Sequence, residues 1–363
     1  MQRRDFFKTS LVGLGALSLA SSNALAFSGE RRFHVVFDFD VKSDKKNFPL
    51  DLYNPLPFNS DFQQLRFLQI DGNFESHSIN SDNAYDVNTH YAKYSSSEKA
   101  KLLRITMEIE TKNVSVPLEL IKKASQANLP IPQDVKEFLK PTEHIPTSGK
   151  AKAKALEITQ GISDTFEKVQ AIYEWVCYNT YRDPKTIGCG VGHVGKAMDA
   201  GYLGGKCTDI SSIFVSFLRS VNIPAREVFG IRLGKSEYSA KALGGADAKG
   251  FAKISGGQHC RTEYYIAGAG WIPCDPADIR KLILVEDLKY EDPRVQELKK
   301  RYLHSWEMNW VGFNWGRDFT LSPKPANATI NNFGYPYAEI DGEALNYYNP
   351  KTFSYNFTSQ EIL

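Results

Sequence analysis

Three residues of this chain have the side-chain types of a thiol-activating triad: Cys207, His259 and Asp275. Cys207 follows two glycines at the predicted start of a helix, where free N–H groups and the positive dipole end favour a reactive thiolate. In such a triad the imidazole takes the thiol proton and the carboxylate orients the imidazole. The backbone N–H of Cys207, with its neighbours at the helix N-terminus, could hold an oxyanion. Spacing alone does not show that Cys207 is reactive, because an isolated cysteine at a helix start is more often a small buried thiol.

The helix behind Cys207 is predicted from the spacing of its apolar residues. Between residues 207 and 221 they recur at helical intervals and make one buried stripe. Asn222 suits a left-handed helix end, and Pro224 prevents the helix from resuming at once. Asp209, in the first turn, fits either a charge at the helix terminus or a catalytic group.

The other two residues are predicted to lie on a β-hairpin. Residues 259–266 and 271–275 have the composition of strands, and the short segment between them is a glycine-containing turn. The histidine opens the first strand and the aspartate ends the second. If both lie on one face, the alternation of a strand places Cys260 and Cys274 together on the other face.

A glycine-rich loop at residues 188–195 (GCGVGHVG) contains the pattern G-x-G-x-x-G. A dinucleotide site is not predicted there, because no apolar strand precedes the loop and Gly201 follows too soon for a crossover helix. We expect a flexible loop near a cleft, which His193 could line.

Segments along the chain resemble the transglutaminase-like superfamily, most closely its bacterial exported cysteine-peptidase homologues. The similar segments are GGKCTD at 204–209 with IPAR at 223–226, HC at 259–260, GWIPCD at 270–275, Trp175, GRD at 316–318 and PLP at 55–57. The first four occur in the order in which that family places its cysteine, histidine and aspartate.

The resemblance implies that Cys207 is the nucleophile, His259 the base and Asp275 the residue that orients the base. It also implies an α+β fold with a papain-like core, in which helices pack on an antiparallel sheet. Relatives often carry an aromatic residue two positions after the histidine, where this chain has Arg261. The substrate pocket could therefore differ from that of relatives.

The region before the core is predicted to be an all-β, sandwich-like domain, because short strand patterns alternate there with turn residues. His77 and His90 lie in a Ser/Asn-rich stretch of this region and are predicted to be surface residues. The last strands are expected to pack back on this domain. The expected divisions are a signal peptide at 1–26, the β domain at 27–117, a helical linker at 118–146, the catalytic core at 147–323 and C-terminal strands at 324–363.

The first 26 residues resemble a twin-arginine export signal. The motif RRDFFK at 3–8 precedes an apolar run at 11–20 that is too short to span a bilayer, and ALA at 24–26 suits cleavage near Ala26. This predicts export by the twin-arginine (Tat) machinery to the periplasm or another exported location, with no membrane span after cleavage. Loss of the segment lowers the formal net charge from +2 to zero, which argues against nucleic acid as a partner.

The five cysteines show no metal-site spacing, so neither a metal nor a cofactor is expected. An odd number of cysteines in an oxidising compartment leaves at least one thiol unpaired within the chain. Two disulfides remain open on sequence grounds, Cys260 with Cys274 and Cys177 with Cys189.

Two classes of function fit these observations. The first is an exported acyl-transfer enzyme that cleaves or transfers amide bonds of a peptide or protein through a Cys207 thioester, more readily a protease or amidase than a crosslinking transglutaminase. Its substrate could belong to the cell envelope. The second is a non-catalytic binding or scaffold protein that retains the fold.

Overall fold

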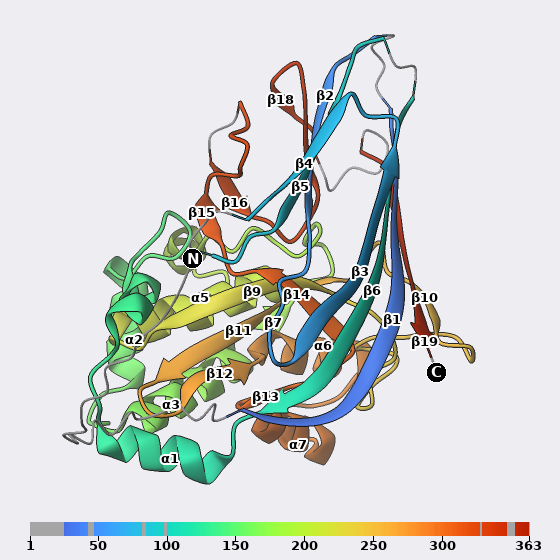
Figure 1. Ribbon diagram of the computed structural model, residues 1–363. Coiled ribbons are helices and arrows are strands. Elements are labelled where there is room, and N and C mark those ends of the chain that lie inside the picture. Colours follow the sequence, from blue (N-terminus) through green and yellow to red (C-terminus); the bar gives the residue numbers. More distant parts are fainter. Residues whose placement is uncertain are drawn as a thin grey trace, which may run out of the picture.

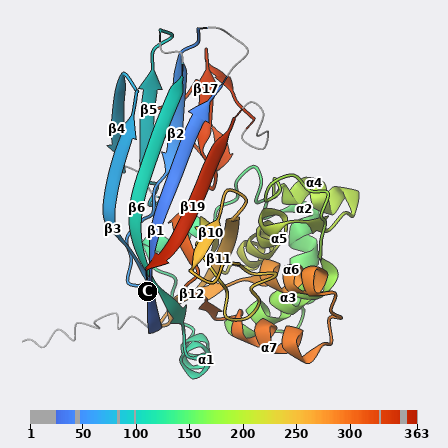
Figure 2. The same cartoon turned by 90° about the vertical axis from the view of Figure 1, so that its right-hand side faces the viewer.

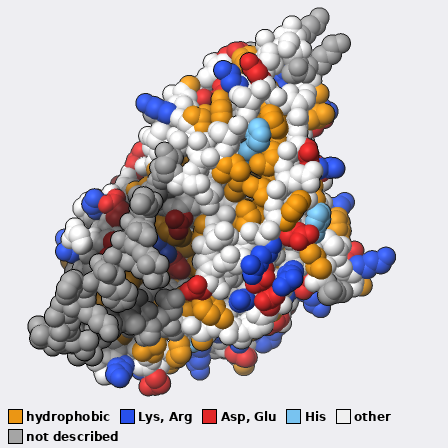
Figure 3. Space-filling view, in the orientation of Figure 1, with side chains coloured by type: hydrophobic (Ala, Val, Ile, Leu, Met, Phe, Trp, Pro, Cys, Tyr) orange, Lys and Arg blue, Asp and Glu red, His pale blue; other side chains and the backbone are white. Residues whose placement is uncertain are grey.

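The structure is a computed structural model that describes residues 25–42, 47–81, 85–97, 100–326, 329–346 and 353–362. The expectations on the twin-arginine motif and its apolar run lie outside these residues. A tall strand-rich half stands beside a half that contains most of the helices (Figures 1 and 2). Among the described residues no helix is long and apolar enough to cross a membrane. On the described part of the face in Figure 3, charged side chains of both signs intermingle.

The strand-rich half is built from two antiparallel sheets. One has the order β10-β19-β1-β6-β13, with β3 also paired to β6, and the other has the order β18-β17-β2-β5-β4. In β1 every second residue from Phe33 to Val41 is buried, as expected for a strand with one face on a core. The strands are β1 (Ala26–Val41), β2 (Leu50–Pro55), β3 (Gln63–Gly72), β4 (Ser76–Asn80), β5 (Thr89–Tyr94), β6 (Lys101–Ser115), β10 (Phe251–Lys253), β13 (Ser305–Trp306), β17 (Tyr337–Ile340), β18 (Glu343–Ala344) and β19 (Tyr355–Ile362).

The other half packs helices against an antiparallel sheet of order β12-β11-β9-β14. Every residue of the central helix α5 except Asp209 is buried, and α5 contacts β9 and β11. The strands are β9 (Ala225–Arg232), β11 (Gln258–Ile266), β12 (Gly270–Cys274) and β14 (Trp310–Asn314). The helices are α1 (Leu118–Ala127), the 3₁₀ helix η1 (Gln133–Leu139), α2 (Gly149–Ile158), α3 (Thr165–Asn179), α4 (Val194–Ala200), α5 (Cys207–Ser220), α6 (Pro276–Glu286) and α7 (Pro293–Arg301). Two small pairs are β7 (Tyr181–Arg182) with β8 (Gly204–Gly205) and β15 (Arg317–Phe319) with β16 (Ile330–Asn332).

The two halves share a core and exchange strands. Ile231 of β9 and Val311 of β14 belong to the same hydrophobic cluster as the buried side chains of β1. Strand β10 pairs with β19, and β13 pairs with β6, although both come from the middle of the chain. The central sheet is therefore held between α5 on one side and the strand-rich half on the other, which gives the site a rigid support.

The predicted α+β fold is confirmed, with an antiparallel sheet in the core and a strand-rich region before it. The helix predicted from residue 207 is α5, and Asn222 just after it has the expected left-handed backbone, with a φ of 62°. The hairpin is also confirmed, because β12 pairs along its length with Thr262–Ile266 of β11.

All five cysteines are free thiols in the structure, so neither disulfide that the sequence left open is formed. The register of the hairpin explains why Cys260 and Cys274 are not bonded. Cys274 lies directly opposite Thr262, two positions along the strand from Cys260. The two cysteines occupy diagonal positions on one face, which is a poor geometry for a disulfide.

The prediction that His90 is a surface residue is wrong. The Ser/Asn-rich stretch leads into β5, which lies between β2 and β4, and His90 is 0 % exposed there. Its Nδ1 lies 3.3 Å from Nδ2 of Asn54. Burial, with a smaller effect of His77, lowers the pKa of His90 to about 4, so the ring is neutral at physiological pH.

Candidate active site

Cys207 is the first residue of α5 and is only 3 % exposed. Asp209 fixes the backbone around it. Its Oδ2 accepts a hydrogen bond from the backbone N–H of Lys206 at 2.9 Å, and its Oδ1 accepts one from Gly192 at 2.8 Å. A Cβ atom on Gly205 would lie 2.3 Å from this carboxylate, so the position has room only for glycine. Asp209 thus has a structural role, joining the glycine-rich loop to the start of the helix.

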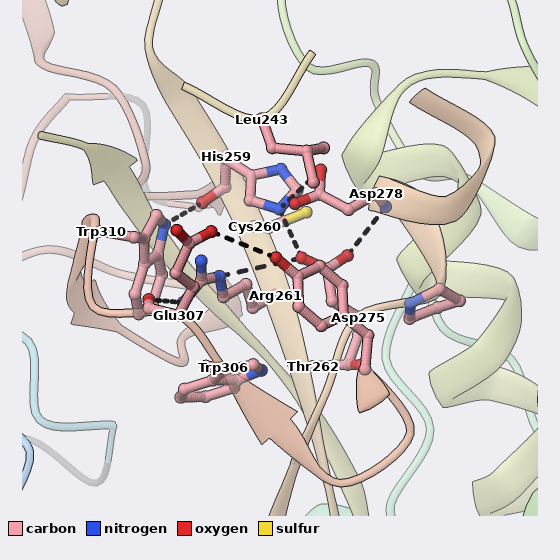
Figure 4. Close-up of polar contacts among 12 residues, drawn as sticks. Leu243, His259, Cys260, Arg261, Thr262, Asp275, Asp278, Trp306, Glu307 and Trp310 are labelled. Carbon is pink, nitrogen blue, oxygen red and sulfur yellow. Dashed lines mark hydrogen bonds and ion pairs between the residues drawn. The ribbon is translucent and has the colours of Figure 1, made fainter. Parts of the chain in front are cut away.

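His259 and Asp275 are brought together by the hairpin (Figure 4). Nε2 of His259 lies 2.7 Å from Oδ2 of Asp275, and both side chains are buried. Asp275 is also the N-cap of α6, because its Oδ1 accepts the backbone N–H of Asp278 at 3.0 Å. These two bonds fix the carboxylate and, through it, the imidazole. They leave Nδ1 as the ring nitrogen that can exchange a proton with a thiol, and His259 is one of the groups that lower the pKa of the Cys207 thiol.

A second carboxylate, which the sequence did not single out, also faces the histidine. Oδ1 of Asp278 lies 3.5 Å from Nε2 of His259, and Nη2 of Arg232 lies 2.5 Å from the same oxygen. All three side chains are buried. In the sequence, Asp278 has only the pattern of an acidic residue in a helix's first turn, and nothing there connects it to Arg232 at the end of β9.

Arg261, which stands where relatives often carry an aromatic residue, lies next to Asp275. Its Nη1 donates to the backbone oxygen of Glu307 at 2.7 Å, and its Nε lies 3.8 Å from Oδ2 of Asp275. The guanidinium stands over the ring of Trp310 at 4.8 Å. Nε1 of Trp310 in turn donates to the backbone oxygen of His259 at 2.9 Å. Arg261 therefore supports the histidine–aspartate pair from the side away from the cleft described below.

These contacts set the charge state of the buried groups. Burial and the charge of Arg232 would lower the pKa of His259, but Asp278 and Asp275 outweigh them and raise it. Burial, then the charge of Asp278, raises the pKa of Asp275. Burial would also raise the pKa of Asp278, but Arg232 and then His259 hold it well below its usual range. An imidazolium at this position is therefore stabilised by its neighbours.

Two further thiols, Cys189 and Cys260, surround Cys207. The pKa of Cys207 is lowered most by hydrogen bonds with Cys189 and then with Cys260. Burial raises it, and the hydrogen bond and charge of His259 lower it further. The pKa of Cys189 is raised by the hydrogen bond with Cys207 and by burial, and that of Cys260 by burial and then by Cys207. Cys207 is therefore the thiol of the three that most readily carries negative charge.

A cleft with a volume of about 380 Å³ is lined by Cys207 and His259. The segment from Ser255 to Gln258, just before the histidine, lines it as well. Three aromatic residues near the end of the chain form another part of its wall: Tyr335, Phe353 and Tyr355. Cys207 and His259 therefore border an open space large enough for a small ligand.

His193 lies elsewhere. It is the N-cap of the short helix α4, and its ring lies 5.0 Å from that of His144. It lines a separate hollow beside the glycine-rich loop and is not among the described residues that line the cleft at Cys207. Arg317, from the GRD segment, holds that loop in place by donating to the backbone oxygen of Gly192 at 2.8 Å.

Two groups of side chains place possible metal ligands close together. The ligand atoms of His259, Asp275 and Asp278 lie within 4.8 Å of one another. Arg232 already neutralises one of the two carboxylates of this group, which disfavours a further cation there. The second group is Glu143, His144 and Asp318. Asp318 is already bonded to Nδ1 and to the backbone N–H of His144.

Comparison with known sequences identifies the family. The sequence profile of the transglutaminase-like superfamily matches residues 152–276, a range that contains the cysteine, the histidine and the aspartate. An uncharacterised protein of Haemophilus influenzae is 40% identical over 365 residues, which cover 97% of this chain and 98% of that protein. The chain belongs to the transglutaminase-like superfamily. The resemblance drawn from the motifs is thereby confirmed.

The fold also has a counterpart among solved structures. A protein of Cytophaga hutchinsonii, described as a candidate cysteine protease, aligns with 93% of this chain and 100% of its own at a TM-score of 0.54 and 14% identity. At that identity the similarity concerns the fold. The periplasmic domain of TgpA from Pseudomonas aeruginosa aligns over 74% of this chain and 93% of its own at 15% identity, but its TM-score of 0.33 is too low to indicate a common architecture.

Proposed function

We propose that this protein is a cysteine-dependent acyl-transfer enzyme that cleaves amide bonds of a peptide or protein. The observation that carries the proposal is the arrangement at Cys207. A buried thiol with a lowered pKa stands at a helix start, and the bonded pair of His259 and Asp275 lies next to it. In this proposal Cys207 is the nucleophile, His259 the acid–base group and Asp275 the residue that orients it.

The proposed reaction has two stages. His259 takes the proton of the Cys207 thiol, and Sγ attacks the amide carbonyl carbon to form a tetrahedral intermediate. The C–N bond then breaks, the imidazolium gives its proton to the departing amine, and a thioester remains. Water attacks the thioester while His259 accepts one of its protons; the acid leaves and the thiol regains its proton. The two carboxylates beside His259 stabilise the imidazolium in both stages.

The oxyanion of each tetrahedral intermediate requires hydrogen-bond donors near Sγ. The backbone N–H of Thr208 is already bonded to the oxygen of Cys189 at 2.9 Å. It is therefore unavailable unless the loop moves. We propose that the backbone N–H of Cys207 and the positive end of the α5 dipole stabilise the oxyanion.

Hydrolysis fits this site better than transfer to an amine. A crosslinking transglutaminase must admit a lysine-like amine beside its thioester. Here the cleft is lined by the cationic side chains of Arg182, Lys206, Arg232 and Lys281. These charges repel a protonated amine, whereas water enters without such a penalty. We therefore propose a protease or amidase.

The proposed location follows from the first 26 residues. Their twin-arginine pattern supports export by the Tat machinery to the periplasm, with cleavage near Ala26. Peptides or proteins of the cell envelope would be the substrates within reach there.

Alkylation of Cys207 with iodoacetamide at different pH values tests the proposed function. Site-resolved mass spectrometry would separate Cys207 from the other four thiols. We expect half-maximal reactivity well below the value of about 8.5 of a free thiol, and a shift toward that value in His259→Ala. A profile centred near about 8.5 in both proteins would contradict the proposal and favour a binding or scaffold protein that retains the fold.

A further inference from the structure

The cleft at Cys207 carries a charge pattern that amide hydrolysis alone does not require. Its described lining includes four cationic side chains from four different elements or loops, and it includes no aspartate or glutamate. The four are Arg182 of β7, Lys206 before α5, Arg232 of β9 and Lys281 of α6.

One of these cations is already neutralised within the protein. Arg232 is paired with Asp278 at 2.5 Å. Arg182, Lys206 and Lys281 have no carboxylate within the 4.0 Å of an ion pair among the described residues, and all three are partly buried. Partly buried cations without a carboxylate in ion-pair contact repel one another and lose hydration, and a ligand that supplies negative charge would offset this cost.

The unfavourable environment of these cations is clearest at Lys281. Burial is the largest cause that lowers its pKa, to about 8, and the charges of Arg232 and Arg182 lower it further. The negative charges of Asp278 and Cys207 act in the opposite direction. Lys281, Arg182 and Cys207 line the same cleft, where the charges of Arg182 and Cys207 act on Lys281.

A neutral donor lies in the same space. Gln258, directly before the proposed base, lines the cleft and is 9 % exposed. Its Nε2 is buried and meets no acceptor among the described residues. A buried amide N–H without an acceptor is also costly, and a bound oxygen atom would satisfy it.

We propose that this cleft binds a substrate carboxylate close to the cleaved amide, through Lys281 and Arg182, with Lys206 adding to the field. The substrate class is therefore an anionic peptide, with the carboxylate either at its C-terminus or on an acidic side chain. The aromatic wall formed by Tyr335, Phe353 and Tyr355 covers the apolar part of such a ligand. This inference rests on the proposed function, since it places the anion relative to the Cys207 thiol.

Two alkylating reagents that differ only in charge test the inference. Iodoacetate and iodoacetamide have the same leaving group and nearly the same size, so the ratio of their rates at Cys207 reports the effect of one carboxylate. We expect this ratio to exceed that of glutathione at least tenfold, equivalent to about 1.4 kcal/mol. It should fall at least threefold in Lys281→Met and in Arg182→Gln.

Lys300→Met is the matched control, because it removes an exposed lysine of α7 that does not line the cleft. It should leave the ratio unchanged. Each variant's iodoacetamide rate is its own reference, so a change in thiol reactivity cancels in the ratio. A ratio equal to that of glutathione, or one insensitive to both cleft substitutions, would overturn the inference.

Protection of Cys207 by short peptides separates the two sources of the carboxylate. N-acetyl-dialanine carries a free C-terminus, and the carboxamide of N-acetyl-glutamyl-alanine carries only an acidic side chain; the carboxamide of N-acetyl-dialanine is neutral. Stronger protection by either anionic peptide than by the neutral one supports the inference and identifies the source, whereas equal protection by all three overturns it. Slow labelling of Cys207 by iodoacetamide that is independent of His259 would instead contradict the proposed function itself.

Discussion

Replacing Asp278 by asparagine should weaken both the fold and the charge state of the site. The carboxylate lies 2.5 Å from Nη2 of Arg232 and 3.5 Å from Nε2 of His259, and all three groups are buried. Breaking a buried ion pair by removal of one charge costs about 3–5 kcal/mol. Asparagine keeps an oxygen that can accept the arginine's hydrogen bond, so we expect the lower end, about 3 kcal/mol.

The pH dependence of this loss follows from the two shifted groups. Asp278 has a lowered pKa, so its contribution is complete above the unfolded value of about 4 and is lost as the pH falls through the folded value. His259 has a raised pKa, so its contribution is complete below the unfolded value of about 6.5 and is lost as the pH rises through the folded value. The difference between wild type and Asp278→Asn should therefore be largest between about pH 4 and 6.5.

Urea unfolding followed by tryptophan fluorescence, repeated across this pH range, measures the difference. The same variant should raise the pKa of Cys207 in the alkylation profile, because Arg232 then faces His259 without a neighbouring charge to offset it. Glu297→Gln on the exposed side of α7 is the matched control and should change neither quantity. An Asp278→Asn protein as stable as the wild type at pH 5.5, with an unchanged alkylation profile, would refute this reasoning.

Two smaller changes test how the site is held in place. Gly205→Ala should lower the free energy of unfolding by about 1–3 kcal/mol, since its Cβ would lie 2.3 Å from Asp209. Gly256→Ala is the control and should be nearly neutral, because no heavy atom lies within 4 Å of the added Cβ. Thermal unfolding of both variants measures the difference. Trp310→Phe should cost about 0.5–1.5 kcal/mol in urea unfolding, because the backbone oxygen of His259 loses its indole donor; an unchanged midpoint would mean that this bond contributes nothing.

Local patterns were sufficient to predict the elements that carry the proposed triad. The helical spacing after Cys207 corresponds to α5, and the alternating strands around His259 correspond to β11 and β12. These signals are reliable because one buried face of a helix or strand fixes its side-chain period. The family motifs then implied that Asp275 orients the histidine, and the structure places the two side chains in contact.

Long-range contacts account for what the sequence did not reveal. Asp278 and Arg232 are far apart in the sequence, and only the fold brings the first turn of α6 to the end of β9, where the two side chains form an ion pair. No strand was predicted between β9 and β11, yet this segment contributes β10 to the sheet of the strand-rich half. His90 was misplaced because its polar neighbours in sequence do not determine which strands flank β5.

The central claim is that Cys207 is held as a thiolate by the protonated His259. The most direct measurement is the ultraviolet absorbance of thiolate as a function of pH, taken as the difference between the wild type and Cys207→Ser. We predict a thiolate signal that persists well below the pKa of about 8.5 of a free thiol and is lost at neutral pH in His259→Ala. A signal that rises only near about 8.5 in both proteins would contradict the claim.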